Sequence, residues 1–167
     1  TVTLEPHNKK WLYALEMPGQ RPQLESVQSW MTSDFQLLTR NPVKTRIRYD
    51  ITSYPEYRIS GLHEGELQTA LQLPRQQHGK TKALMHEWQS EDLSEDQIID
   101  RALKLFNEDD FYYTLRPPLL QNDRIDEFIF ETKQGFCEHY ASAFVVMMRA
   151  AGIPARVVLG YQGGEYN

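Results

Sequence analysis

The stretch TKQGFCEHYASAFVVMMRAAGIPARVVLGYQGG, residues 132–164, decides how the second half of the chain folds. It contains Cys137, the only cysteine of the chain, which follows Gly135 by two residues. Glycine favours an end to the preceding element, so a new helix is predicted to open at Phe136 and Cys137. Apolar residues then recur at i, i+3, i+4 and i+7, and this spacing predicts a helix buried along one face by Ala141, Phe144, Val145 and Met148.

The same stretch predicts where the helix ends. Arg149 lies in its last turn, Gly152 suits a left-handed cap near Ala151, and Pro154 cannot continue a helix. The apolar segment that follows, Ala155 to Tyr161, is predicted to be a strand that closes on a Gly-Gly turn. The expected unit is therefore a helix, a tight turn and a buried strand.

A thiol at the start of a helix can be a nucleophile. Backbone N–H groups in the first turn lack acceptors, and the positive end of the helix dipole lies there, so both stabilise the reactive thiolate. The same N–H groups can bind an oxyanion. The alternative is that Cys137 is a small side chain packed beside an apolar helix face, and position alone leaves both interpretations open.

Residues 1–74 are predicted to form a small antiparallel β unit, either a sandwich or an open barrel. Residues 9–17 and 44–54 alternate apolar and polar side chains at period two, and 34–40 and 65–73 are weaker strand candidates. The alternation predicts that one set of side chains is mostly buried: Trp11, Tyr13, Ile47, Tyr49 and Ile51.

Residues 75–167 follow a helical period instead. Residues 80–88 place Leu84 and Trp88 on one face. Residues 94–110 form a stronger helix candidate, because Ser94 and Gln97 make a capping box ahead of a stripe formed by Ile98, Ile99, Ala102, Leu105 and Phe106. Residues 123–133 are predicted to form a short helix capped by Asp123.

Composition excludes some classes of function. The 167 residues carry a net charge of −5 and no run of Lys or Arg, which argues against a nucleic-acid partner. The longest apolar run, residues 143–148, is far shorter than the roughly 18 residues that a membrane span needs. The single cysteine and five scattered histidines lack metal-ligand spacing, so no metal and no other cofactor is expected.

The cysteine segment resembles the transglutaminase-like superfamily, a branch of the papain-like cysteine enzymes. The family pattern is a glycine, any residue, the catalytic cysteine and an aromatic-Ala pair, followed by a helix, Gly-Ile-Pro-Xaa-Arg and a strand ending in Gly-Tyr. The matching residues in this sequence are Gly135, Cys137, Tyr140-Ala141, Gly152-Ile153-Pro154, Arg156 and Gly160-Tyr161. The resemblance implies that Cys137 is the catalytic nucleophile.

Two further segments, FYYTLRPPLL (111–120) and DEFIFETKQGFCEHYASAF (126–144), resemble a bacterial subgroup of that family. Its members are inner-membrane proteins that carry a transglutaminase-like domain in the periplasm. The resemblance therefore implies that this chain is part of a periplasmic domain and that the parent protein is anchored in the membrane outside this piece. The expected fold is α+β, with an antiparallel β unit at 1–74 and the helical N-terminal portion of a transglutaminase-like domain at 75–167.

The sequence departs from the family pattern in two ways. Animal transglutaminases have Gln before the cysteine and Trp after it, whereas Phe136 and Glu138 stand here, so their acyl-donor preference does not transfer. The family's base is a His on a strand well after the cysteine helix, oriented by an Asp on the next strand. The chain is expected to lack both residues and the later strands, so the 167-residue piece alone is predicted to be inactive.

The histidines that are present are expected to have other roles. His139 lies two residues from Cys137, about 200° around a helix, which predicts packing or hydrogen bonding rather than proton transfer. His7, His63, His78 and His86 are predicted to be exposed or structural. A second oxyanion donor could come from Tyr112 or Tyr113, for which the alternative is a core or groove aromatic.

The implied chemistry is acyl transfer through a thioester on a carboxamide or peptide carbonyl, giving cross-linking or deamidation. Two alternatives stay open: a protease or peptidoglycan amidase with the same thiol chemistry, and a catalytically inactive binding scaffold. The expected partner is a protein or peptide substrate, with a peptidoglycan-related substrate as one option. The missing strands would also expose apolar surface beside residues 157–159, which predicts self-association of the piece.

Overall fold

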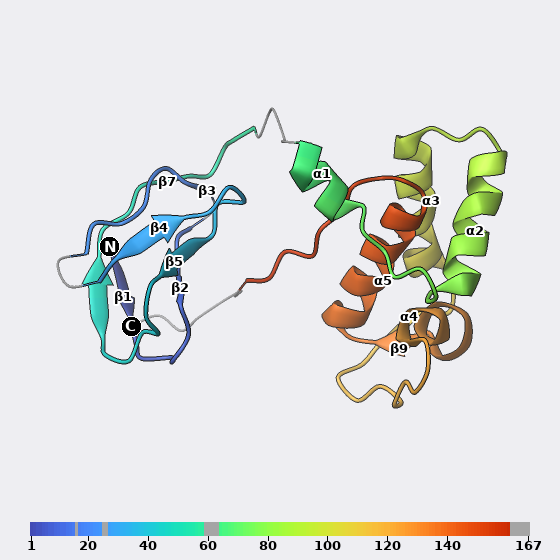
Figure 1. The fold of residues 1–167 in the computed structure, drawn as a ribbon. Coiled ribbons are helices and arrows are strands. Elements are labelled where there is room, and N and C mark those ends of the chain that lie inside the picture. Colours follow the sequence, from blue (N-terminus) through green and yellow to red (C-terminus); the bar gives the residue numbers. More distant parts are fainter. Residues whose placement is uncertain (16, 25–26, 59–63, 161–167) are drawn as a thin grey trace. The chain divides into compact units, whose positions relative to one another are not determined.

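The computed structural model describes residues 1–15, 17–24, 27–58 and 64–160. The chain divides into two compact units, Thr1–Gly61 and Leu62–Asn167 (Figure 1). The first unit contains short strands and the second contains the helices, coloured green to red in Figure 1.

Among the described residues, the first unit contains the strands β1 (Val2–Leu4), β2 (Trp11–Leu12), β3 (Met17–Pro18), β4 (Ser29–Met31), β5 (Leu37–Thr39), β6 (Ile47–Tyr49) and β7 (Ser53–Tyr54). All described pairings are antiparallel: β1 with β6, β3 with β7, and β2–β5–β4 as a three-stranded sheet. The antiparallel β unit expected from the sequence is therefore present.

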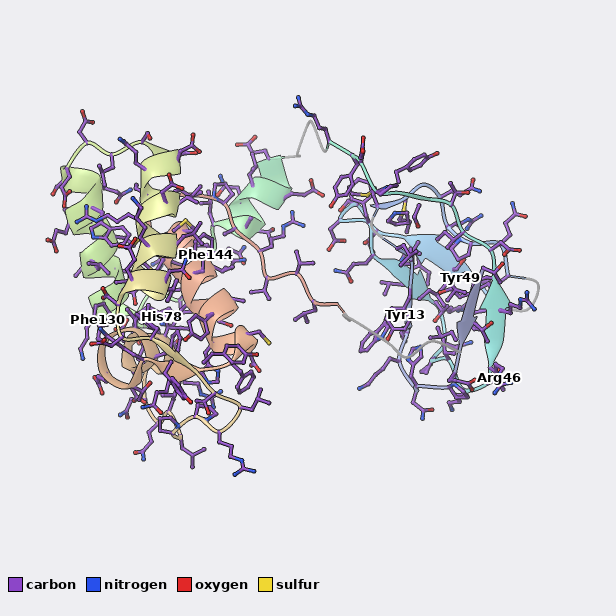
Figure 2. All side chains as sticks on the ribbon, turned by 180° about the vertical axis from the view of Figure 1, so that it is seen from behind. Tyr13, Arg46, Tyr49, His78, Phe130 and Phe144 are labelled. Carbon is purple, nitrogen blue, oxygen red and sulfur yellow. The ribbon has the colours of Figure 1, made fainter. Side chains whose placement is uncertain are left out.

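A small core lies inside this unit, formed by Leu4, Leu12, Leu37, Val43 and Tyr49. The Tyr49 hydroxyl donates to the backbone oxygen of Tyr13 at 2.7 Å and accepts from the Tyr13 backbone N–H at 2.8 Å. Both tyrosines are labelled in Figure 2. Burial raises the pKa of Tyr49, which keeps the phenol protonated as the donor in this bond.

The predicted buried set of this unit is partly wrong. Tyr49 is buried and Tyr13, Ile47 and Ile51 are half-buried, but Trp11 is 42% exposed. Leu12, which pairs with Leu37, faces the core instead. Side chains in a strand alternate between the two faces of the sheet, and the predicted register of β2 is wrong by one residue. Trp11 therefore lies on the outer face, where the sequence predicts a core residue.

The second unit contains the helices α1 (Glu64–Ala70), α2 (Gly79–Ser90), α3 (Glu95–Glu108), α4 (Arg124–Glu127) and α5 (Cys137–Ala150), with a π-helical segment η1 (Phe128–Thr132). Two short strands, β8 (Tyr112–Tyr113) and β9 (Gln134–Gly135), pair in parallel. In Figure 1, α2, α3 and α5 run side by side, with α4 and β9 at the end where α5 begins. No helix of the described residues is long and apolar enough to cross a membrane.

The core of the helical unit joins α2, α3, η1 and α5 through Met85, Trp88, Ile98, Ala102, Phe128, Ile129, Ala143, Met147 and Met148. The capping box predicted for α3 is confirmed, because Ser94 and Gln97 bond reciprocally at its N-terminus. Asp123 caps α4 as predicted by accepting the Asp126 N–H at 3.2 Å. Local sequence signals therefore predict these helix ends correctly.

Helix α5 begins at Cys137 and ends at Ala150, with Ala151 as its cap and Gly152 at φ 76°, as predicted. Its most buried residues are Ala143 and Met147, whereas Ala141 and Phe144 of the predicted stripe are only half-buried. The helix contacts α2, α3, α4 and η1. Because several elements cover it, its buried surface is broader than one stripe and centred on a different face.

The prediction for residues 65–73 is wrong. The sequence suggests a strand of the β unit, but residues 64–70 form helix α1. Glu, Leu, Gln and Ala favour a helix where no neighbouring strand is available. The Ala70 carbonyl accepts the Ala155 N–H at 3.1 Å, so α1 belongs to the helical unit.

The prediction of a strand from Ala155 to Tyr161 is also wrong for the described residues of this segment. Residues 155–160 form no strand, and Val158 and Leu159 are 90% and 89% exposed. A strand requires a hydrogen-bonded neighbour, and none pairs with this segment among the described residues. Tyr161 and the Gly-Gly turn lie outside the described residues.

The N-terminus of α2 is capped by a distant side chain. His78 at its N-cap has a left-handed backbone and no side-chain capping bond. Asp126 of α4 instead accepts the N–H groups of Lys80 at 2.8 Å and Thr81 at 3.0 Å, and the Thr81 hydroxyl at 2.6 Å. Asp126 is buried, so this carboxylate ties α4 to α2 at the base of the unit.

Asp123 predicts how the helical unit responds to acid. Burial opposes its ionisation, but hydrogen bonds from the His78 backbone and ring and from the Asp126 N–H outweigh burial and lower the pKa of Asp123. Because the pKa of Asp123 is lower in the folded state, its carboxylate stabilises the fold fully at pH values above the pKa of an unfolded Asp, about 3.9. This stabilisation is lost as the pH falls through the pKa of the folded state. We expect the thermal midpoint to fall between about pH 5 and pH 3, and to fall less in Asp123→Asn. Thermal unfolding followed by far-UV circular dichroism measures the midpoint at each pH. The control is Asp100→Asn, on an exposed site of α3. An equal fall of the midpoint in Asp123→Asn and in the unmodified chain would contradict the prediction.

Candidate active site

Cys137 is the first residue of the 14-residue helix α5, and its side chain is exposed. Phe136 precedes it as the N-cap in an extended conformation. The interpretation of Cys137 as a buried core residue is therefore wrong, and the predicted helix position is confirmed. An exposed thiol at a helix N-terminus is accessible to solvent and lies at the favourable end of the helix dipole.

Gly135 explains how the chain enters this helix. A Cβ at Gly135 would lie 2.6 Å from the Cβ of His139, 2.7 Å from its Cγ and 3.0 Å from Cε2 of Phe128. Only glycine lets β9 pass this closely over the first turn of α5. The glycine of the Gly-Phe-Cys triplet therefore fixes the angle between β9 and the helix that carries the thiol.

His139 holds the same turn together. Its Nδ1 accepts the Phe136 N–H at 3.4 Å, and its ring contacts Phe136 edge-on at 4.6 Å and Phe128 at 5.6 Å between centroids. The predicted packing and hydrogen-bonding role is confirmed. Spacing in the sequence did not show the contact with Gly135, because that contact depends on the path of β9.

Two backbone donors stand beside the thiol. The His139 N–H bonds the Phe136 carbonyl at 2.9 Å, but the N–H groups of Cys137 and Glu138 have no acceptor among the described residues. Glu138 itself is exposed, as expected for a solvated acid in a first turn. Free N–H groups next to a nucleophile can stabilise a developing oxyanion.

Strand β8 brings tyrosines to the edge of this site. The Tyr112 N–H bonds the Lys133 carbonyl and the Thr114 N–H bonds the Gly135 carbonyl, each at 2.8 Å, so β8 lies directly beside the strand that leads to Cys137. Tyr112 and Tyr113 are 65% and 58% exposed, and Tyr113 stacks on Tyr140 at 6.2 Å. Neither is a core aromatic, and their role as a second oxyanion donor stays a prediction.

The remaining histidines are accounted for individually. His78 bonds Asp123 through Nδ1 at 2.7 Å, His86 is exposed and His7 is half-buried, while His63 lies outside the described residues. Within the described ranges, no group of three His, Cys, Asp or Glu side chains could hold a metal ion. Of the residues singled out in the sequence, the structure brings Gly135, Cys137 and His139 together around the first turn of α5.

The close approach at Gly135 gives a testable prediction. Gly135→Ala should push the first turn of α5 away from β9, because the new methyl group would overlap His139. We expect a loss of about 1–3 kcal/mol in the free energy of unfolding and an altered rate of Cys137 alkylation by iodoacetamide. Gly65→Ala on α1, where a Cβ meets nothing within 4 Å, is the control. Alkylation and stability unchanged in Gly135→Ala would show that this contact does not position the thiol.

Comparison with known families agrees with this geometry. Residues 85–167, which include α3, β9 and α5, match the family model of the transglutaminase-like superfamily. Residues 85–167 belong to the transglutaminase-like superfamily. Residues 1–60, which include the described strands β1 to β7, match the TgpA N-terminal domain.

The chain has similar relatives over almost its whole length. It is 39% identical over 167 residues to the protein-glutamine gamma-glutamyltransferase of Pseudomonas aeruginosa, covering 99% of this chain and 24% of that protein. It is 38% identical to the crystal structure of the periplasmic domain of TgpA from Pseudomonas aeruginosa, with a TM-score of 0.88 and coverage of 99% and 56%. The same domain bound to ethylmercury gives a TM-score of 0.87 and coverage of 99% and 58%.

These relatives confirm the resemblance and the fold. The mixed α/β arrangement, with antiparallel strands followed by helices, matches the TgpA periplasmic domain, and the chain is homologous to it. The chain spans about a quarter of the length of the curated relative and just over half of the solved domain. Activity, substrate and partners of the whole protein are therefore matters for proposal.

Proposed function

We propose that the protein containing this chain catalyses acyl transfer with Cys137 as its nucleophile. The observation that carries the proposal is the exposed thiol on the first residue of α5, inside the transglutaminase-like region. The name of the 39% identical relative supports a carboxamide, the side chain of a protein-bound glutamine, as the acyl donor.

The proposed reaction has two steps, acylation of the thiol and transfer of the acyl group. The Cys137 thiolate attacks the carboxamide carbon, and the tetrahedral oxyanion collapses to a thioester as ammonia leaves with the proton taken from the thiol. A primary amine then attacks the thioester, giving an amide and restoring the thiol, or water gives the carboxylic acid. The free N–H groups of Cys137 and Glu138 would bind the oxyanion in both steps.

The proton transfers require a base and an acid that the described residues do not offer beside Cys137. His139 is occupied in the N-terminal turn of the same helix. From the family pattern, we assign the base and its orienting carboxylate to a His and an Asp in the longer protein. The chain spans only 56% of the solved relative, which leaves room for both. A thiol without a base is mostly protonated at neutral pH and has no acid to protonate a leaving amine.

This assignment predicts that the 167-residue chain alone is catalytically silent. Incorporation of a fluorescent primary amine into a glutamine-containing protein should stay at background with the chain and rise with the longer protein. Ammonia release measured in parallel separates amine transfer from deamidation. Turnover by the 167-residue chain would show that its own residues supply the base.

The same assay separates the alternative functions. Ammonia release without amine incorporation would favour deamidation, and cleavage of peptide bonds or peptidoglycan amides without ammonia release would favour the protease or amidase. A longer protein that is inactive on all of these substrates would favour the binding scaffold. We favour transglutaminase-type transfer because the named relative carries that activity in its name.

The location and partners belong to the same proposal. Homology to the periplasmic domain of TgpA supports a periplasmic domain of an inner-membrane protein, acting on protein or peptide substrates in the cell envelope. Val158 and Leu159, 90% and 89% exposed, support self-association of the isolated chain through this apolar segment. Sedimentation velocity across a concentration series should then show a mass above 19.6 kDa; a monomer at every concentration would contradict it.

A further inference from the structure

The outer face of the β2–β5–β4 sheet carries a row of three apolar side chains, Trp11, Leu38 and Trp30, that do not belong to the buried core. Trp11 and Trp30 both pair with Leu38, from opposite sides, so the three side chains lie in line across the sheet. Their neighbours Leu12 and Leu37 face the core, so the row faces outward. Trp11 and Trp30 are 42% and 41% exposed.

One of these indoles is fixed in place. The Trp11 Nε1–H donates to the Tyr13 hydroxyl at 2.8 Å, and the His7 ring stacks on it at 5.9 Å with an interplanar angle of 15°. The Lys9 ammonium lies over the same ring at 5.9 Å from its centroid. A ring held this way loses little freedom when a ligand stacks on it.

A groove with basic and neutral polar side chains begins beside this row. Arg40 and Gln28 lie one position beyond the paired residues Thr39 and Ser29, and the Arg40 Nη1 donates to the Gln28 Oε1 at 3.2 Å. Both side chains line a groove of about 650 Å³, together with the polar residues Asn41, Lys44 and Thr45 and the apolar residues Val27, Pro42, Val43 and Ile47. Among the described residues, no acidic side chain lines the groove, and neither Arg40 nor Lys44 forms an ion pair.

We propose that this face is a binding site for a saccharide polymer that carries carboxylate groups. Sugar rings would stack through their C–H faces on Trp30 and on the part of the Trp11 ring that His7 and Lys9 leave exposed. The two indoles are two strand spacings apart, about 9.5 Å, comparable with a disaccharide. The carboxylate would pair with Arg40 and Lys44 in the groove. The neutral polar side chains Gln28, Asn41 and Thr45 can hydrogen-bond a ligand rich in hydroxyl and amide groups.

Charge gives the site a direction. Asp34 lies in the turn between β4 and β5, at the other end of the hairpin from Arg40, where it is bonded to Gln36 at 2.7 Å. The ligand carboxylate is therefore drawn to the groove end of the hairpin and away from the turn. All residues of this proposed site belong to the first unit, so binding is expected whether or not the Cys137 thiol is present.

The test compares two saccharides that share a backbone. Soluble peptidoglycan glycan strands freed of their stem peptides alternate a neutral amino sugar with one bearing a carboxylate, whereas chitotetraose has the neutral sugar only. Titration of the 167-residue chain, followed by calorimetry and tryptophan fluorescence, should show at least about tenfold tighter binding of the charged strands, with the difference reduced by salt. Equal affinity for both saccharides, or binding of neither, would overturn the proposal.

Variants test the assignment of residues. Trp30→Ala should weaken both saccharides at least about tenfold, while Trp30→Tyr retains stacking and most of the affinity. Arg40→Gln should remove the preference for the charged strands and leave chitotetraose unchanged. Tyr57→Ala and Arg48→Gln, exposed residues of the same unit outside the groove, and Cys137→Ala should bind as the unmodified chain does.

A membrane surface is the competing occupant of an aromatic and basic face. Vesicles of anionic phospholipid provide the probe, because tryptophan and lysine also favour the membrane interface. Vesicle binding that depends on Trp30, without saccharide binding, would overturn the proposal. Far-UV circular dichroism of each variant shows that loss of binding is not loss of folding.

Discussion

Replacement of Cys137 by alanine should lower acyl transfer by the longer protein at least about a thousandfold, because the thioester cannot form without the thiol. The residual rate would come from substrate binding and from the N–H groups of the helix terminus. Cys137 is the only cysteine in the chain, so no neighbouring thiol of this chain can take over. Initial rates of amine incorporation measure the effect.

Cys137→Ser provides the matched control for this variant. It keeps the size and the hydrogen-bonding ability of the side chain but replaces a thiol by a much weaker acid. Because Cys137 is exposed, both variants should retain the stability of α5 and its circular dichroism spectrum. Undiminished turnover by a folded Cys137→Ala protein would remove Cys137 from the mechanism.

The second large effect concerns stability. Asp126→Asn should lower the free energy of unfolding of the helical unit by about 3 kcal/mol, since it breaks buried charged hydrogen bonds at the start of α2. The carboxylate accepts three hydrogen bonds from Lys80 and Thr81, and the residue is only 7% exposed. An asparagine would direct an N–H₂ group at one of these donors.

Asp96→Asn is the control for Asp126→Asn. Asp96 is an exposed acid in the first turn of α3, where only the helix dipole is affected, and the expected loss is below about 1 kcal/mol. Urea unfolding followed by far-UV circular dichroism compares the two variants. A loss for Asp126→Asn no larger than for Asp96→Asn would show that the distant cap does not hold the unit together.

Elements whose signals lie in adjacent residues could be predicted from the sequence. The capping box of Ser94 and Gln97 and the apolar run between Gly135 and Gly152 each place helix ends within one or two residues. The position of Cys137 follows from the second of these signals. Such features depend on local hydrogen bonds, which a single sequence displays directly.

Elements that depend on distant partners could not be predicted in this way. Residues 65–73 have apolar spacing short enough to fit a strand or a helix, and the bond between Ala70 and Ala155 belongs to the folded unit. Val157 to Leu159 have strand-forming side chains but no paired neighbour in the described residues. The outward orientation of Trp11 depends on a two-residue strand whose register is set by Leu37.

The same distinction applies to the candidate site. The thiol, its helix and the role of His139 could be predicted from spacing and from family resemblance. The close approach of His139 to Gly135 and the pairing of β8 with β9 required the path of the chain. Asp126 could not be recognised as the cap of α2, because it lies 45 residues from Thr81.

The most direct test of the central claim is the mass of the protein during reaction with an activated acyl ester. The longer protein, quenched in acid within the first turnovers, should carry one acyl group, on the proteolytic peptide that contains Cys137, and hydroxylamine should remove it as expected for a thioester. Cys137→Ala should carry none. Turnover with the acyl group on another side chain, or with no covalent intermediate when hydrolysis is slowed, would contradict the account.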